Sequence, residues 1–340
     1  MTGLVLRPSV WCAIALATQF VIPNDGPYKL TGNSPVTYVG VAHAYDAVGS
    51  RLYSSTRGGV YQYDTAAMKM VGRTSTVRGA GSLSLDTSRN ELYVLALHDD
   101  AMSVVDVTTK KVVRTFAAPA WFNVFYEPGR GELYYLRGDT REVRVADRQD
   151  GHTLTTLTLG GRPSFVIGDP DRQRVLVRLA DKPMIQVIDT KDHSIVASWP
   201  ARADGPSAMA INESGSRVFI SSGRDLLMLD GTTGKELAKV PAGDPTYSMV
   251  FDPATQYLAA LSGPGRVNVV KVDDTSMKLV QSLDTHASVQ ELFLDPKTHK
   301  ILGISRYADQ GVMMDITSPY ATAEEGFAGA GTLLTLTLRK

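Results

Sequence analysis

The chain has 340 residues, of which 43% are hydrophobic and 21% charged, so it is long enough and apolar enough to bury a sizeable core. Basic and acidic residues both number 35, and the formal net charge of zero argues against a nucleic acid or an anionic membrane as the main partner. The single cysteine, Cys12, excludes an intrachain disulfide, a cysteine zinc site and a CxxC redox pair.

The N-terminal segment predicts export. Residues 1–7 carry one basic side chain, residues 9–17 are short and apolar, and Ala15 and Ala17 fit a small-x-small cleavage site. This apolar stretch is too short to span a bilayer as an ordinary helix. We therefore expect a signal peptide over residues 1–17 and a periplasmic or extracellular domain over residues 18–340. The alternative is an N-terminal segment without a targeting role.

Seven copies of one short pattern follow, starting near residues 39, 82, 123, 164, 207, 248 and 291. Each copy is an apolar run that ends in an acid or amide, at Asp46, Asp86, Glu127, Asp169, Asn212, Asp252 and Asp295. A second apolar run begins six residues later, and these runs start 40–43 residues apart, at Leu52, Leu92, Leu133, Val175, Val218, Leu258 and Ile301. This period, with several short strands in each unit, indicates the blades of a β-propeller.

One copy illustrates the expected blade. Residues 165–167, 174–178, 185–189 and 194–199 are rich in alternating and β-branched residues and predict four strands, here named a to d. The turn after strand a contains Asp169 and Pro170. An aspartate side chain accepts bonds from backbone N–H groups just ahead of it, and proline presets φ for the turn. We therefore interpret the seven turn acids as structural.

The two ends of the chain predict closure of the ring. Residues 27–34 resemble the end of a strand d, and residues 332–338 alternate strongly. Either residues 332–338 form strand c of the last blade after one long loop over residues 309–331, or residues 312–316 do. We expect the first arrangement because it leaves a place for the N-terminal strand. The long loop then either covers the funnel as a lid or packs outside blade seven.

The sequence thus predicts an all-β fold: a single seven-bladed β-propeller with four-stranded blades. The N-terminal strand pairs with the C-terminal blade and so closes the ring, because an open ring leaves two unpaired sheet edges.

The repeats resemble the YVTN-type seven-bladed propellers of secreted bacterial proteins. The resemblance covers roughly residues 27–340 and rests on VVDVTTKKVV at 104–113, IQVIDT at 185–190, FDPAT at 251–255 and LDPKTHK at 294–300. It implies an exported protein with a long loop before the final strand. It assigns no catalytic residue, because that family shares no catalytic motif. Blade one departs from the pattern at Ser54 and Ser55, where the family's strand is more apolar.

Ligand-binding candidates lie in the loops after strands b and d, which gather on one face of a propeller around the central channel. Arginines can hold a carboxylate or phosphate through two parallel bonds, and the candidates are Arg57, Arg137, Arg178, Arg224, Arg266 and Arg306. Trp121, Phe122 and Tyr247 can stack on a ligand or anchor a partner. The alternatives are that acidic neighbours make these loops mixed in charge and solvated, and that Trp121 and Phe122 pack under the next blade.

Three histidines are candidate catalytic bases: His43, His98 and His286. His43 occupies a strand-a position that is apolar in the other six copies, so it is either a channel base or ligand, or a hydrogen-bonded core histidine. The sequence contains no HExxH, cysteine–histidine cluster, GxSxG or SxxK motif. It therefore predicts no cofactor and no metal, and leaves open a metal held in the channel by residues far apart in sequence.

The leading functional prediction is an exported, non-catalytic binding or interaction propeller that uses its central funnel face. The expected partner is a protein or a small molecule, with a small anion as the ligand that the arginines suit. One alternative is an enzyme, a lyase or a lactonase-like hydrolase, acting on a small molecule in the funnel. Another is an accessory subunit that docks on a redox enzyme. No nucleic-acid partner and no integral membrane segment are expected.

Overall fold

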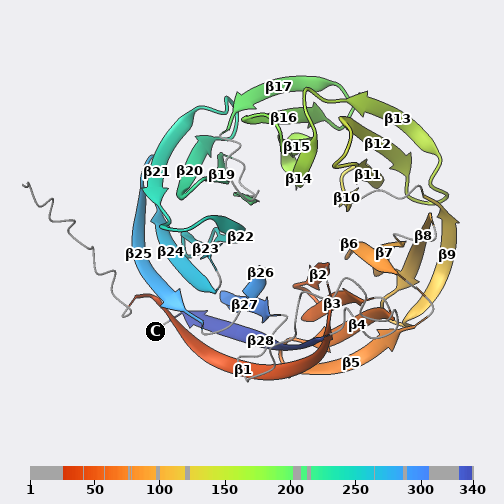
Figure 1. Cartoon of the computed structure of the whole chain (residues 1–340), viewed down its shortest axis with the longest axis horizontal. Coiled ribbons are helices and arrows are strands. Elements are labelled where there is room, and N and C mark those ends of the chain that lie inside the picture. The colour runs from red at the N-terminus through yellow and green to blue at the C-terminus, as the bar shows by residue number, and fades with distance from the viewer. Residues whose placement is uncertain are drawn as a thin grey trace, which may run out of the picture.

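Seven four-stranded antiparallel sheets surround a central axis in the computed structural model of the chain (Figure 1). The structure describes residues 26–40, 42–56, 58–75, 77, 79–96, 100–118, 123–201, 208–212, 216–263, 265–285, 289–305 and 329–338. The predicted all-β, seven-bladed propeller is confirmed. None of the described segments forms a helix with the length and apolarity that a membrane span requires.

The first three blades are each built from consecutive strands. Blade 1 contains β2 (His43–Asp46), β3 (Arg51–Thr56), β4 (Gly59–Asp64) and β5 (Lys69–Thr74). Blade 2 contains β6 (Ala80–Asp86), β7 (Glu91–Ala96), β8 (Ala101–Asp106) and β9 (Lys111–Ala117). Blade 3 contains β10 (Asn123–Glu127), β11 (Glu132–Leu136), β12 (Glu142–Asp147) and β13 (Thr153–Thr158).

Blades 4 to 6 repeat this order. Blade 4 contains β14 (Pro163–Asp169), the 3₁₀ turn η1 (Pro170–Arg172), β15 (Arg174–Leu179), β16 (Met184–Asp189) and β17 (Ile195–Pro200). Blade 5 contains β18 (Met209–Ile211), β19 (Arg217–Ser222), β20 (Asp225–Asp230) and β21 (Glu236–Pro241). Blade 6 contains β22 (Thr246–Asp252), β23 (Tyr257–Ser262), β24 (Arg266–Val272) and β25 (Met277–Asp284). Strand a of each blade lies nearest the axis and strand d lies at the periphery (Figure 1).

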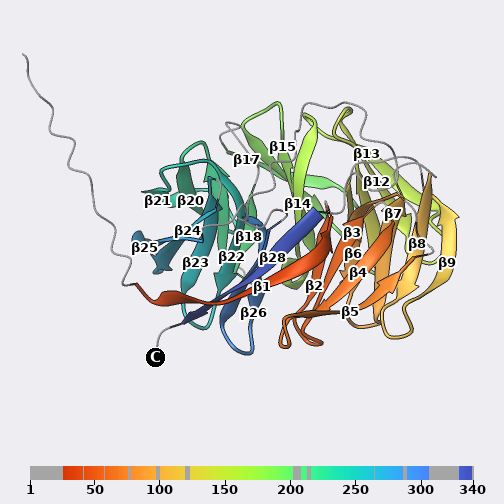
Figure 2. The ribbon, with the colours of Figure 1, turned by 60° about the horizontal axis from the view of Figure 1, so that its bottom comes forward.

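Blade 7 joins the two ends of the chain. It contains β26 (Val289–Asp295), β27 (Lys300–Ser305), β28 (Gly329–Leu338) and, as its outer strand, β1 (Tyr28–Val39). Strands β1 and β28 pair from Tyr28 opposite Leu338 to Val39 opposite Gly329, side by side in Figure 2. The first of the two expected arrangements is therefore confirmed, and β1 continues past the predicted end at residue 34. The possible lid over residues 309–331 falls mostly outside the described residues.

The turn acids act as expected from their chemistry. Asp86 Oδ1 accepts bonds from the backbone N–H and the hydroxyl of Ser88, at 3.0 and 2.6 Å. Aspartates that close strand c do the same, because Asp106 Oδ1 accepts the N–H groups of Thr108 and Thr109. Each carboxylate thus satisfies backbone donors that a tight turn would otherwise leave unpaired.

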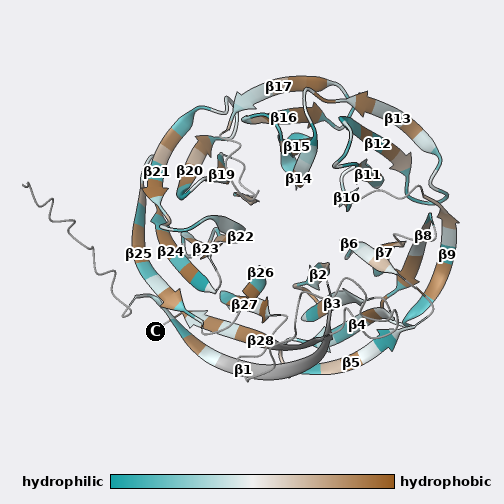
Figure 3. Ribbon diagram, in the orientation of Figure 1, coloured by the Kyte–Doolittle hydropathy of each residue, from teal (hydrophilic) through white to brown (hydrophobic). Residues whose placement is uncertain are grey.

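The apolar core is divided among the seven junctions between neighbouring blades. One cluster of buried side chains lies at each junction. Among the clusters formed by described side chains, the cluster between blades 5 and 6 is the largest and the cluster between blades 7 and 1 is the smallest. Outer strands bury alternate residues, as in β9, and β21 and β25 alternate between apolar and polar colours in Figure 3. Burial between blades, not in the channel, therefore holds the ring together.

Polar contacts reinforce four consecutive junctions on the face of the a–b and c–d turns. At each one, the first residue of strand b contacts the c–d turn of the next blade. The pairs are Glu91 with Arg148 (3.6 Å), Glu132 with His193 (2.8 Å), Arg174 with the carbonyl of Gly231, and Arg217 with the carbonyl of Asp274 (2.6 Å).

Candidate functional site

The structure describes half of the predicted site residues. His98, His286, Arg57, Arg306, Trp121 and Phe122 lie outside the described residues, and their roles stay predictions. The described ones are His43, Arg137, Arg178, Arg224, Arg266 and Tyr247. These six residues do not converge on one point. They divide into a group on the loop face, a buried arginine and a histidine between two blades.

The described loops after strands b and d lie on one face, here called the rim. After blade 5, the d–a loop is held at both ends, because Ala242 N–H donates to the Arg224 carbonyl and Gly263 N–H donates to the Pro245 carbonyl. After blade 3 the same pattern recurs, with Leu159 N–H bonded to the Arg141 carbonyl. Backbone bonds thus fix the d–a loops after blades 3 and 5 against the b–c turns beside them, so these parts of the rim present their side chains from an ordered backbone.

The rim at blades 5 and 6 brings two predicted arginines together around an aspartate that was not among the predicted site residues. Asp244 lies 3.8 Å from Arg224 and 3.4 Å from Arg266. Tyr247 follows three residues later, with 53% of its surface exposed. We call Arg224, Asp244, Tyr247 and Arg266 the blade 5–6 rim site. Two guanidinium groups share one carboxylate there, beside an exposed aromatic ring.

The rim at blades 3 and 4 carries further arginine–aspartate pairs. Arg137 donates to Asp139 at 2.7 Å, and this bond holds the pKa of the Asp139 carboxyl below its ordinary value. Arg162 lies 3.5 Å from Asp181, whose pKa is lowered chiefly by a bond from the Arg162 backbone N–H. Four described rim arginines, Arg137, Arg162, Arg224 and Arg266, are therefore already paired, and a small anion must compete with these carboxylates to bind them.

Arg178 lies inside β15 and not in the b–c loop to which the sequence analysis assigned it. Its side chain is among the fully buried ones, and its Nη1 donates to the Ser221 hydroxyl of blade 5 at 2.9 Å. Ser221 also accepts the backbone N–H of Ala208 at 3.0 Å. Arg178 is thus a link between blades 4 and 5, and its burial keeps it from a ligand at the rim.

His43 links blade 1 to blade 7. Its Nδ1 lies 3.0 Å from Glu291 Oε2, and the exposed fractions of the two side chains are 2% and 41%. The ring of Phe293 packs edge-on against the imidazole. The buried Nε2 makes no hydrogen bond to any described residue. The arrangement is a histidine–carboxylate pair in which the carboxylate, and not the imidazole, is open to solvent.

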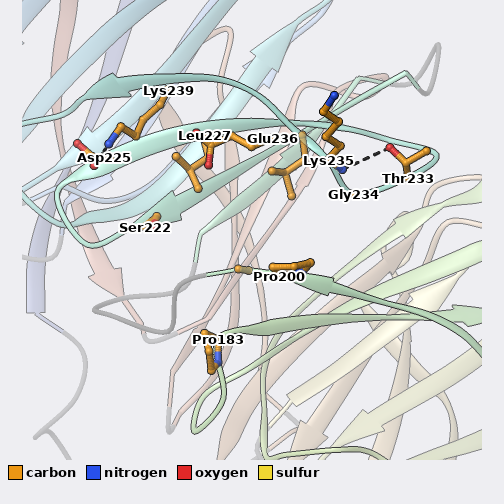
Figure 4. Close-up of a pocket in the computed structure, with 12 residues that line it drawn as sticks. Pro183, Pro200, Ser222, Asp225, Leu227, Thr233, Gly234, Lys235, Glu236 and Lys239 are labelled. Atoms are coloured by element: carbon orange, nitrogen blue, oxygen red, sulfur yellow. Dashed lines mark hydrogen bonds and ion pairs between the residues drawn. The ribbon is translucent and has the colours of Figure 1, made fainter.

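A groove of about 570 Å³ separates blades 4 and 5 (Figure 4). Pro183 and Pro200 form one side, while Leu227 of β20 points into the gap from the other. At one end, Lys239 pairs with Asp225 at 3.3 Å. Asp225 directly follows Arg224, so this end of the groove adjoins the blade 5–6 rim site. Sequence periodicity carries no signal for the groove, because the spacing between blades depends on side-chain volumes across the junction.

One group of described residues has the geometry to hold a metal ion. The ligand atoms of Asp147, Asp150 and His152 lie within 4.8 Å of one another in the c–d turn of blade 3. His152 Nδ1 is 2.7 Å from Asp150, and both side chains are mostly exposed. Hydrogen bonds within the turn account for this grouping, as in the other c–d turns.

No family model matches the chain. The uncharacterized protein YncE of Salmonella typhi is 26% identical over 145 residues, which cover 41% of this chain and 41% of that protein. The YncE protein of Salmonella typhimurium is 25% identical over 145 residues. The matched segment thus spans about two fifths of the length of these curated relatives. The chain therefore has weak similarity to YncE, and the YVTN-type resemblance is not confirmed.

Two solved structures are similar to most of this chain. Hydrazine synthase of Kuenenia stuttgartiensis superposes with a TM-score of 0.67 at 16% identity, over 78% of this chain and 92% of that chain. U3-55K superposes with a TM-score of 0.69 at 10% identity, over 91% of this chain and 98% of that chain. At these identities the likeness establishes the β-propeller fold and nothing further about the chain.

Proposed function

We propose that the chain is a non-catalytic interaction propeller that holds a protein partner at the blade 5–6 rim site. The observation that carries the proposal is the exposed Tyr247, three residues after the aspartate that two arginines share. Tyrosine and arginine are the residue types that most often dominate binding energy at protein interfaces. Their backbone is fixed by the loop bonds, so little ordering is needed when a partner binds.

The ion pairs favour a protein over a small anion as the ligand. Arg266 donates to Asp244 at 3.4 Å, so a small carboxylate must displace this bond before Arg266 can hold it through two bonds. A protein surface can cover Arg224, Asp244 and Arg266 together and leave their pairing intact. Two positive charges against one negative charge leave the site basic, which complements an acidic patch on the partner.

The groove between blades 4 and 5 extends this surface. It adjoins the rim at Asp225 and has the apolar side chain of Leu227 on one side and two proline rings on the other. A protein bound at the rim can therefore insert an extended segment beside Pro200. An accessory subunit that docks on a redox enzyme is one case of this role.

Site-specific photo-crosslinking tests the proposal. A photoreactive phenylalanine at position 247 replaces one aromatic ring by another, and the same residue at Val196, which is 58% exposed on β17, is the control. We expect one discrete adduct from position 247 in the native cells, lost when Arg224 and Arg266 are both changed to Glu. Equal labelling at both positions, or no adduct at position 247, contradicts the proposal.

We also propose that the protein works outside the cytoplasm, in the periplasm or the extracellular space. The support is the apolar stretch over residues 9–17, followed by a small-x-small site at Ala15 and Ala17. The partial similarity to YVTN-type repeats points the same way. N-terminal sequencing of the mature protein is the test, and a mature chain that retains residues 1–17 contradicts export.

The histidine–carboxylate pair favours one second candidate, a lyase or hydrolase acting in the central channel. Glu291 is the accessible member, and His43 behind it can orient the carboxylate and share its proton. This hypothesis predicts turnover of a small lactone or ester that is abolished in Glu291→Gln and reduced in His43→Gln. Equal turnover by the wild type and Glu291→Gln rules it out.

A further inference from the structure

The junction between blades 1 and 2 lacks the contact that the next four junctions share. Arg51 is the first residue of β3 and so corresponds to Glu91, Glu132, Arg174 and Arg217. Its Nη1 donates to Asp64 at 2.8 Å and to the carbonyls of Gly49 and Ser50 at 3.1 Å. Among the described residues, all of these partners belong to blade 1. Arg51 therefore leaves the c–d turn of blade 2 without its usual partner.

A cavity of about 340 Å³ occupies this place. It lies on the face opposite to the rim, between the strands of blade 1 and the turns of blade 2. Its polar lining comes from both blades and includes Asp46, Arg51, Gln62, Asn90, Thr108 and Lys110. The volume is within the range of pockets that hold small molecules, which is roughly 300–1,000 Å³.

The inner wall of the cavity contains a polar residue where the repeat specifies an apolar one. The residues at the position of Gln62 in the c strands of blades 2 to 6 are Val104, Val145, Val187, Met228 and Val269. Gln62 is only 8% exposed, and its Nε2 lies 3.4 Å from the hydroxyl of Tyr53, which is 3% exposed. A buried amide and phenol weaken a core unless they have polar partners, so this pair needs an explanation beyond packing.

Lys110 keeps the two blades joined around the cavity. Its Nζ donates to the carbonyl of Val71 at 2.7 Å, near the outer strand β5. Residue 72 is glycine, and a Cβ there would lie 2.5 Å from Nζ, so a larger residue would displace the lysine from its present position. Lys110 therefore closes the junction between blades 1 and 2 at its periphery. The cavity next to Arg51 remains open on the inner side of Lys110.

The charges around the cavity balance. Among the lining residues, Arg51 and Lys110 are positive and Asp46 is negative. Asp64 lies outside the lining and neutralises Arg51 through an ion pair of 2.8 Å. An anion has no net attraction to such a site, whereas a hydroxyl group can both donate to a carboxylate or amide oxygen and accept from a guanidinium or amide nitrogen. The lining thus offers donors and acceptors in a neutral setting.

We propose that the cavity between blades 1 and 2 binds a small, neutral, hydroxyl-rich molecule of the size of a monosaccharide or disaccharide. Gln62 and Tyr53 form the buried inner wall of the site, and Arg51, Asn90 and Asp46 contact the ligand hydroxyls nearer the surface. The site lies on the opposite face from the blade 5–6 rim site and is independent of the interaction role proposed there.

Binding of sugars by calorimetry tests the site. The probes are glucose, galactose, mannose, maltose and lactose, with inorganic phosphate and citrate as anions, each used up to about 10 mM. The main variant is Gln62→Val, which installs the residue that four other blades carry. The control is Gln149→Val, the same substitution at an exposed turn position of blade 3.

At least one sugar should bind the wild type and Gln149→Val equally, and Gln62→Val should weaken it by about tenfold or more. If Gln62→Val does not give a folded circular dichroism spectrum, Arg51→Gln carries the same expectation. The proposal is overturned if no sugar in the panel binds, if phosphate or citrate binds more tightly than every sugar, or if the folded variants bind within twofold of the wild type.

Discussion

Blade 4 and blade 1 have the same strand order and register but fill their interiors differently. Where blade 4 has Val166, Val177 and Val187, blade 1 has His43, Ser54 and Gln62. Both blades form complete four-stranded ladders. Hydrogen-bonded strands and turn acids therefore suffice to shape a blade, and the residues that face the next blade can vary without loss of the architecture.

The difference also shows where polar chemistry concentrates. Blade 4 uses its polar side chains to fasten junctions, as Arg178 does with Ser221. Blade 1 places His43 toward blade 7 and Gln62 toward blade 2. Its polar residues thus line the two junctions that depart from the regular pattern, which is where a ligand or a proton can interact with buried groups.

The two blades should differ most in the unfolding free energy lost on substitution at one shared position of their outer strands. Trp199 is 3% exposed and packs over Gly234 and Arg174, so Trp199→Ala should lower the free energy of unfolding by about 3–5 kcal/mol. The corresponding Thr74→Ala in blade 1 should lower it by only about 1 kcal/mol. Urea unfolding measures both, and equal losses would contradict a core concentrated in the regular blades.

The strand from the N-terminal end depends on a single glutamine of blade 6. Gln281 accepts the backbone N–H of Tyr28 at 2.9 Å and donates to its carbonyl at 2.7 Å, all within a buried site. Gln281→Leu leaves both backbone groups without this partner and should destabilise the protein by about 2 kcal/mol. Gln149→Leu at an exposed turn is the control, expected within about 0.5 kcal/mol of the wild type.

A regular junction should show a defined pH dependence. Hydrogen bonds from Arg114 hold the pKa of Glu91 below its ordinary value. A carboxyl with a lowered pKa in the folded state contributes stability above its unfolded pKa and loses it as the pH falls through the folded pKa. Glu91→Gln should therefore lower the free energy of unfolding by about 1–2 kcal/mol at neutral pH. Unfolding curves near pH 3 should show a difference in unfolding free energy between the wild type and Glu91→Gln that shrinks toward zero. A difference that does not change with pH would contradict the proposed role of the Glu91 charge.

The smallest effect is expected at the polar position of blade 1. Gln62→Val removes a buried amide and adds the side chain that blades 2 to 4 carry, so the unfolding free energy should change by less than about 1 kcal/mol. A loss of more than about 2 kcal/mol would mean that Gln62 is a structural residue, comparable to Gln281. Thermal unfolding with the Gln149→Val control distinguishes these outcomes.

The fold was predictable because its signal is local and repeated. The acids at Asp86 and Asp252, and the second apolar runs six residues later, mark the same a–b turn in each blade. The pairing of the N-terminal strand with the last blade was predictable because an open ring would leave two unpaired sheet edges. The length of β1 was not predictable, because its pairing partner β28 lies at the far end of the sequence.

The site was harder to predict because it depends on distances across blades. The sequence placed Arg178 in a loop, since the end of a strand and the start of its turn share the same residue types. Asp244 was missed because its two arginines come from different turns. Gln62 carried a usable signal, since aligning the c strands shows apolar residues at its position in five other blades, whereas the cavity beside it depends on the side chain of Arg51.

Affinity for the partner captured through position 247 tests the central claim most directly. Tyr247→Ala removes an exposed ring that supports no core cluster, so the unfolding midpoint should not change. Calorimetry should nevertheless show binding weakened by about tenfold or more. An affinity within twofold of the wild type would contradict the assignment of the blade 5–6 rim site as the interaction surface.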